Sequence, residues 1–141
     1  AKPHDWLTLT GGSIGQGLPL AVGAAIAKPD RPVIALHGDG GALYTIQAMW
    51  SQARENLNIT NIIFANNSYE ILKIELSRVG AIKTGKRADS MLSLENPSID
   101  WISLSKSMGV PSYQPNTVED FVKIFSSAVK EPGPTTIVIH I

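Results

Sequence analysis

The stretch from Gly38 to Asn67 decides the fold of this chain, and it reads GDGGALYTIQAMWSQARENLNITNIIFANN. A short apolar run at 33–36 precedes it and a second run at 59–65 lies inside it, and both runs predict buried strands. Between the two runs, apolar residues recur at helical spacing from 42 to 55. Strand, helix and strand in this order indicate a parallel sheet with helices packed on its faces.

Apolar runs and helical patterns alternate along the rest of the chain as well. This alternation predicts an α/β fold with three layers, α/β/α, around a mostly parallel sheet. Residues 117–120 read Thr-Val-Glu-Asp, a helix start in which a threonine cap is followed three residues later by an acid. The pattern fails at 77–97, where Gly, Lys, Arg, Ser and Asn dominate, and we expect a mobile loop there. The remaining predicted elements are helices at 19–28, 69–76, 99–108 and 117–130 and strands at 111–114 and 135–140.

Length and composition narrow the classes of protein. With 141 residues we expect one domain over 1–141. The 12 basic and 12 acidic residues cancel, which argues against nucleic acid or an anionic membrane as a partner. The absence of cysteine excludes a disulfide framework, a thiolate metal site and a cysteine nucleophile. The chain starts at Ala1, without an initiator Met and without a signal-peptide pattern, so we expect a piece of a longer chain, with a reducing cytoplasm as the default compartment.

Asp39 and Asn66 each follow a predicted strand, separated by one helix and one strand. Because neighbouring parallel strands end at the same sheet edge, where ligands bind, their side-chain oxygens can meet. A carboxylate and an amide oxygen, completed by carbonyl and phosphate oxygens, are ligands that Mg²⁺ accepts. The glycines around Asp39 allow a sharp turn, and the following helix directs its positive end at an anion. The pair predicts a site for a metal and a diphosphate, although each loop alone is ordinary turn chemistry.

The segment resembles the thiamine-diphosphate motif, which opens with Gly-Asp-Gly and closes with Asn-Asn. The resemblance implies thiamine diphosphate and Mg²⁺ as cofactors, with Asp39, Asn66 and the Ser68 carbonyl as metal ligands. Asn67 is the alternative to Asn66, because the motif as usually written ends on it. Many members carry a serine where this chain has Gly41, so only backbone N–H groups can hold phosphate there. The cofactor contacts implied in this segment are Gly38, Gly40, Gly41, Ala42, Asn66, Ser68 and Tyr69.

A second glycine-rich stretch, GGSIGQGLP, runs from Gly11 to Pro19. It lacks the spacing of a dinucleotide-binding fingerprint, and a loop leading into a helix is the simplest interpretation. In the pyruvate decarboxylase, acetolactate synthase and benzoylformate decarboxylase superfamily, a similar loop precedes the Gly-Asp-Gly motif. The resemblance implies that the Gly12 carbonyl holds the aminopyrimidine group, with Ser13 beside it, and that Ile14 wedges the cofactor into a bent form. The protein then supplies positioning and electrostatics for the cofactor's chemistry.

Residues just past the second motif are the candidates for a substrate pocket. If Leu72 and Glu75 line it, the Leu72 side chain gives an apolar wall that suits a 2-oxo acid; the alternative is a core Leu72 and a solvated Glu75. We expect a structural role for His37. The basic stretch at 83–87 is either a solvated loop or a lid that orders on cofactor binding.

The resemblance extends over most of the chain and is to the C-terminal thiamine-diphosphate-binding (PP) domain of this superfamily. It implies a domain of an acetolactate-synthase-like 2-oxo-acid carboligase or decarboxylase. The Gln-Gly-Met-Val run typical of acetolactate synthases is absent. The alternatives are a benzoylformate-type decarboxylase, a non-catalytic module that retains the fold, and another Mg-dependent phosphate-handling enzyme that uses Asp39 as ligand or nucleophile.

The family's activating glutamate comes from a separate pyrimidine-binding domain, usually across a dimer interface. No segment of this chain resembles that domain, so we expect no catalytic residue within it and no activity of the isolated fragment. The resemblance implies a small 2-oxo acid substrate, a pyrimidine-binding domain of a second subunit as partner, and a homo-dimer or tetramer.

Overall fold

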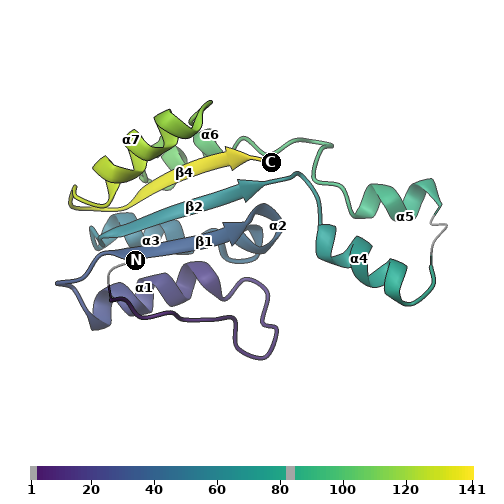
Figure 1. The fold of residues 1–141 in the computed structure, drawn as a ribbon, viewed down its shortest axis with the longest axis horizontal. Coiled ribbons are helices and arrows are strands. Elements are labelled where there is room, and N and C mark those ends of the chain that lie inside the picture. The colour runs from purple at the N-terminus through teal and green to yellow at the C-terminus, as the bar shows by residue number, and fades with distance from the viewer. Residues whose placement is uncertain (1–2, 82–84) are drawn as a thin grey trace.

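A computed structural model describes residues 3–81 and 85–141. The described residues form a four-stranded parallel sheet in the order β1-β2-β4-β3 (Figure 1). Gly38 pairs with Phe64, so β1 and β2 end at nearly the same level and their following loops emerge at one edge. The strands are β1 (Val33–Gly38), β2 (Ile59–Ala65), β3 (Ser112–Tyr113) and β4 (Thr135–His140).

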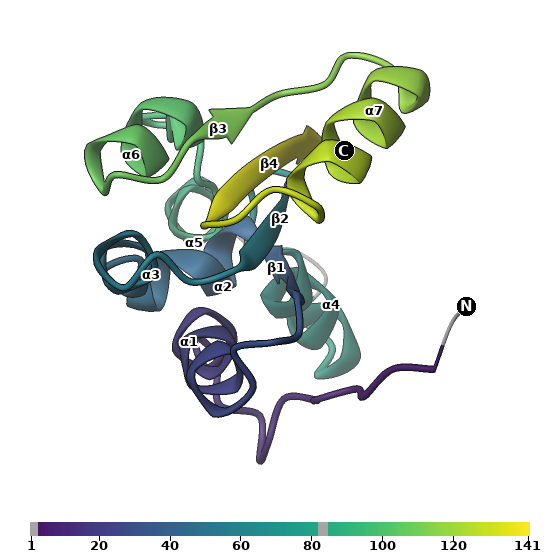
Figure 2. The same cartoon turned by 90° about the vertical axis from the view of Figure 1, so that its left-hand side faces the viewer.

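Helices lie on both faces of this sheet (Figure 2), which confirms the predicted three-layer α/β/α fold. Figure 2 shows α7 on the opposite side of the sheet from α1, α3 and α6. The helices are α1 (Gly17–Ala27), α2 (Asp39–Ala42), η1 (Leu43–Thr45), α3 (Ala48–Arg54), α4 (Glu70–Arg78), α5 (Lys86–Met91), α6 (Trp101–Ser107) and α7 (Val118–Ala128).

The main core lies between the sheet and the layer that contains α1, α3 and α6. Ile63 and Val138 are register partners on β2 and β4, so their side chains share one face of the sheet. Met49 and Trp101 pack against that face from α3 and α6. Full burial of apolar side chains of this size contributes about 1.5–3 kcal/mol each, so this cluster fixes the helices that precede and follow the strands.

Two predicted elements differ from the structure. The single helix expected at 42–55 begins at Asp39 and is divided into α2, η1 and α3, because a 3-10 segment interrupts the α-helical pattern. The mobile loop expected at 77–97 contains helix α5. None of the described residues of α5 is buried, and only Ala88 and Met91 among its 6 residues are apolar, too short a pattern to indicate a helix. Lys83 lies outside the described residues.

The predicted start of α7 is confirmed. The Thr117 hydroxyl oxygen accepts a hydrogen bond from the Asp120 N–H at 3.1 Å, which satisfies one of the free donors of the first helical turn. Within residues 3–81 and 85–141, no helix has the length and apolar character needed to cross a membrane.

Candidate functional site

Asp39 joins the loops that follow β1 and β2. Asp39 is only 2% exposed although it is an acidic residue, and it lies in the first turn of α2. Oδ1 accepts a hydrogen bond from the Gly40 N–H at 2.8 Å, and Oδ2 accepts one from the Asn67 N–H at 2.7 Å. Since each carboxylate oxygen has two acceptor positions, both oxygens keep capacity for a further ligand. The two loops therefore meet at this carboxylate through the Asn67 backbone, and the approach of the Asp39 and Asn66 side-chain oxygens stays a prediction.

The loop after β2 turns sharply at Asn67, whose φ of 53° places it in the left-handed region. The side-chain oxygen of Asn66 accepts the Ser68 N–H at 3.0 Å and closes a turn. Ser68 pairs with Ser93 in an antiparallel bridge whose hydrogen bonds run from Leu94 N–H to the Asn67 carbonyl and from Tyr69 N–H to the Leu92 carbonyl. In such a pair the Ser68 carbonyl points away from the bridge and is not used by it.

Gly40 and Tyr69 bring the two loops into van der Waals contact. A Cβ atom at Gly40 would lie 2.7 Å from Cδ1 and Cε1 of the Tyr69 ring, a distance that no side chain tolerates. The ring therefore packs directly on the glycine backbone. Gly41, the next residue, has nothing within 4 Å of its Cβ position, so its backbone is open to a ligand.

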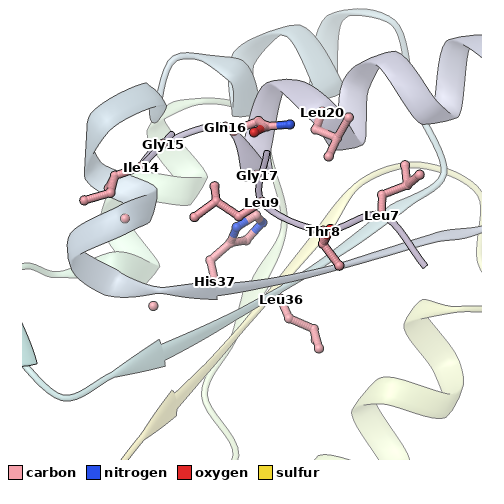
Figure 3. Close-up of a pocket in the computed structure, with 12 residues that line it drawn as sticks. Leu7, Thr8, Leu9, Ile14, Gly15, Gln16, Gly17, Leu20, Leu36 and His37 are labelled. Carbon is pink, nitrogen blue, oxygen red and sulfur yellow. The ribbon is translucent and has the colours of Figure 1, made fainter. Parts of the chain in front are cut away.

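A cavity of about 290 Å³ separates the glycine-rich loop from the end of β1 (Figure 3). Ile14 and Gly15 line it from the glycine-rich loop, and Gly38 and Gly41 line it from the loop that carries Asp39. The two glycine clusters, far apart in the sequence, thus share one cavity. Ile14 is half exposed, which leaves its side chain free to contact a bound molecule.

Gly12 and Ser13 are exposed beside this cavity and do not line it. Gly12 has a φ of 70° and nothing within 4 Å of its Cβ position. The Ala42 side chain packs into the main core, so only the backbone of Ala42 can contact a cofactor.

The substrate-pocket prediction is not reproduced by the cavity in this structure. Leu72 is 41% exposed on α4, and Glu75 forms a 2.6 Å ion pair with Arg78 one turn later on the same helix. Figure 1 shows α4 beyond the end of the sheet, away from its faces, which is why these side chains lie outside the cavity that Ile14 lines. The alternative of a core Leu72 does not hold within the described residues, because the side chain is exposed, and the pocket assignment stays a prediction.

His37 lies at the bottom of the cavity, at the end of β1 (Figure 3). Burial lowers the pKa of its imidazole from 6.5 to about 4, and the neighbouring Asn61 side chain opposes this shift by raising it. The ring is therefore neutral at physiological pH. Among the described residues its Nε2 atom has no hydrogen-bond partner, and its side chain is 9% exposed.

The donor set at the two loops fits a hard divalent cation. One carboxylate, one amide oxygen and one backbone carbonyl are oxygen ligands of the kind that Mg²⁺ takes together with phosphate oxygens. Within the described part of the chain, no cluster of three His, Cys, Asp or Glu side chains exists that could hold a metal. A metal bound at Asp39 would therefore depend on amide, carbonyl and phosphate oxygens for the rest of its shell.

Sequence reasoning missed several residues that hold the site together. Leu92 and Leu94 anchor the loop after β2, and Thr45 bonds to the glycine-rich loop. Leu92 and Leu94 fall within the stretch expected to be a mobile loop, and a backbone hydrogen bond leaves no signal in side-chain chemistry. For Thr45, the only signal in the sequence is a hydroxyl side chain six residues after Asp39, which could have suggested a hydrogen bond near the site.

Comparison with known proteins identifies the family to which this chain belongs. The family described as "Thiamine pyrophosphate enzyme, C-terminal TPP binding domain" matches residues 1–139. The protein named "Putative acetolactate synthase large subunit IlvX" of Mycobacterium tuberculosis is 52% identical over 135 residues, which are 95% of this chain and 26% of that protein. The benzoylformate decarboxylase of Pseudomonas aeruginosa is 30% identical over 136 residues, which are 96% of this chain and 24% of that protein.

Among solved structures, the thiamine diphosphate-dependent 4-hydroxybenzoylformate decarboxylase of Rhodococcus jostii RHA1 is similar, with a TM-score of 0.81 and 38% identity. The similarity covers 92% of this chain and 23% of that one. This chain thus spans about a quarter of the length of these relatives. With the shared fold and the family match over nearly its whole length, the chain belongs to the thiamine pyrophosphate enzymes, as a C-terminal TPP-binding domain.

Proposed function

We propose that this domain binds the diphosphate end of thiamine diphosphate together with Mg²⁺. The observation that carries the proposal is the buried Asp39 carboxylate, which links the loops after β1 and β2 and keeps acceptor capacity on both oxygens. Asn66 and the Ser68 carbonyl complete the protein's share of the metal shell. The open backbone at Gly41 and the N-terminus of α2 supply N–H donors to the phosphates.

The ring half of the cofactor is assigned to the cavity beside these loops. Gly12 offers a backbone carbonyl at an exposed position, and Ile14 offers an apolar side chain at the cavity wall. When bound, thiamine diphosphate supplies a nucleophilic carbon that attacks the carbonyl group of a 2-oxo acid. This domain's residues orient the cofactor, hold the Mg²⁺ that offsets the charge of its diphosphate and offer N–H donors to its phosphate oxygens; they do not transfer the activating proton.

The whole protein is proposed to be a carboligase or decarboxylase of 2-oxo acids, of the acetolactate-synthase-like kind, and the 52% identical relative supports this. The activating glutamate is assigned to a pyrimidine-binding domain of a second subunit in a homo-oligomer. The exposed apolar side chains of Ile71, Leu72 and Ile74 on α4 support such a partner surface next to the site. A benzoylformate-type decarboxylase is the second candidate, and the similarity to the R. jostii enzyme favours it.

Calorimetric titration with thiamine diphosphate tests the proposed cofactor site. We expect the wild type to bind thiamine diphosphate only in the presence of Mg²⁺. Asp39→Ala should lower the affinity by more than about 100-fold, because loss of a residue that only supports a metal ligand already costs ~10–100-fold. Asn66→Ala should weaken binding severely, and Asn67→Ala should weaken it less. Thiamine monophosphate should bind much less tightly than the diphosphate.

Asp30→Ala is the matched control, because Asp30 is an exposed carboxylate in the turn before β1. Circular dichroism of each variant separates loss of binding from loss of fold. Unchanged affinity in a folded Asp39→Ala variant would contradict the metal assignment. Turnover of pyruvate against benzoylformate by the full-length protein decides between the two candidate activities.

A further inference from the structure

The two halves of the glycine-rich loop have different surroundings. Gly11 and Gly12 have φ angles of 61° and 70° and nothing within 4 Å of their Cβ positions. A Cβ at Gly15 would lie 2.6 Å from the Cβ of Tyr44, and a Cβ at Gly17 would lie 2.6 Å from the imidazole of His37. The second half of the loop is thus held by residues on either side of the Gly-Asp-Gly-Gly segment, while the first half is open.

Thr45 adds a hydrogen bond to this packing. Its hydroxyl donates to the Gly15 carbonyl at 2.6 Å across a sequence separation of 30 residues. Thr45 ends η1, which continues directly from the helix that Asp39 begins. The bond therefore ties the glycine-rich loop to the same helical segment that carries the Asp39 carboxylate.

The loop is also bonded to itself, so a constraint at Gly15 reaches its open half. The Gln16 side chain accepts the Thr10 N–H at 3.0 Å, the Thr10 carbonyl accepts the Ser13 N–H at 3.2 Å, and the Ser13 carbonyl accepts the Gln16 N–H at 3.1 Å. These bonds close residues 10–16 into one compact turn. Moving Gly15 would displace Gly12 and Ile14 with it.

We propose that Thr45 is a positioning residue for the ring half of the cofactor. It contacts neither metal nor cofactor, and it sets the separation between the Gly12–Ile14 segment and the Asp39 loop, so that one ligand can engage both. The inference rests on the proposed function, because it takes thiamine diphosphate as the ligand that spans the two loops. Thr45 should therefore contribute to binding of the ring half of the cofactor and not to binding of the diphosphate.

The test compares two ligands on two Thr45 variants, in the full chain and with Mg²⁺ present. Thr45→Val keeps the shape and removes the hydroxyl donor, and Thr45→Ser keeps the donor. For Thr45→Val we expect thiamine diphosphate affinity to fall about 10-fold, the order of magnitude of one lost intramolecular hydrogen bond, with the affinity for inorganic diphosphate unchanged. Thr45→Ser should retain the wild-type affinity for thiamine diphosphate.

Thr117→Val is the matched control, because it also removes a threonine hydroxyl that makes a hydrogen bond, at the cap of α7. It lowers stability without touching either loop, and both affinities should stay at wild-type values. Equal loss of both ligands in Thr45→Val, or the same selective loss in Thr117→Val, would overturn the positioning role. So would unchanged thiamine diphosphate affinity in Thr45→Val. If the wild type binds neither ligand, the proposed function itself fails, a result distinct from all of these.

Discussion

The loops after β1 and β2 and the helical arm made of α4 and α5 lie next to each other in the chain, yet they are held very differently. The loops are joined by the buried Asp39 carboxylate and by the close contact of Gly40 with Tyr69. The arm has no buried residue among those described, and the ion pairs of Glu70 with Lys73 and of Glu75 with Arg78 link neighbouring turns of α4. Such exposed pairs contribute little to stability.

This difference divides the site into two parts. The part proposed to receive metal and diphosphate is preorganised by the core of this chain, since both loops leave strands that are buried on the α3 side. The part expected to face the substrate, on α4, is not fixed by packing within the described residues. We therefore expect changes near the loops to have large effects on folding and binding, and changes on the arm to have small effects on folding.

At the loops and the cavity beside them, the largest expected effect on stability is the response of His37 to acid. The pKa of His37 in the folded chain is about 4, below the 6.5 of a free imidazole, so between these values the unfolded chain binds a proton that the folded chain does not. The stabilisation is complete above pH 6.5 and is lost as the pH falls to 4. The shift corresponds to about 3 kcal/mol in the free energy of unfolding.

Urea unfolding between pH 7 and pH 4 measures this loss. His37→Gln removes the titrating group, so the variant should show a shallower pH dependence in this window, whatever its stability at pH 7. His140→Gln, a change at an exposed residue near the chain end, is the control and should follow the wild type. If His37→Gln kept the wild-type pH dependence of the free energy of unfolding, His37 would be excluded as the cause of that dependence.

A smaller effect is expected where Gly40 meets the Tyr69 ring. Gly40→Ala places a methyl group 2.7 Å from two ring atoms, and overpacking of this kind costs about 1–3 kcal/mol. Gly41→Ala, one residue later with open space at its Cβ position, should change stability far less. In the Tyr69→Ala background the cost of Gly40→Ala should disappear, as a double-mutant cycle measures. If Gly40→Ala cost the same in the wild type and in Tyr69→Ala, the contact with the Tyr69 ring would not be the cause of the destabilisation.

The smallest effect is expected on the arm. Leu72→Ala should change the free energy of unfolding by no more than about 0.5 kcal/mol, because the side chain is exposed in this chain. Leu18→Ala is the matched comparison, since that leucine is 1% exposed in the main core and such a change costs about 2–5 kcal/mol. Thermal or urea unfolding of both variants gives the contrast. Similar losses in the two would mean that the arm packs against the body of the domain.

Much of the fold was predictable because its determinants are local. Alternating apolar runs gave β1, β2 and β4, and the threonine cap marked the start of α7. The meeting of the Asp39 and Asn66 loops followed from a general property of parallel sheets, that neighbouring strands end at one edge. Helix α5 escaped prediction because its 6 residues include only two apolar ones and none is buried, so no periodic apolar pattern is sustained along it.

The sequence by itself determined the oxygen donors available, the turns that glycine permits and the family to which the chain belongs. These depend on side-chain chemistry and on backbone freedom at single positions. Only the tertiary structure decided that Gly11 and Gly12 stand open while Gly15 and Gly17 are packed against Tyr44 and His37, and that Leu72 lies away from the cavity. The physical reason is that these distinctions depend on contacts between residues distant in sequence, and strand pairing and helix packing set those contacts.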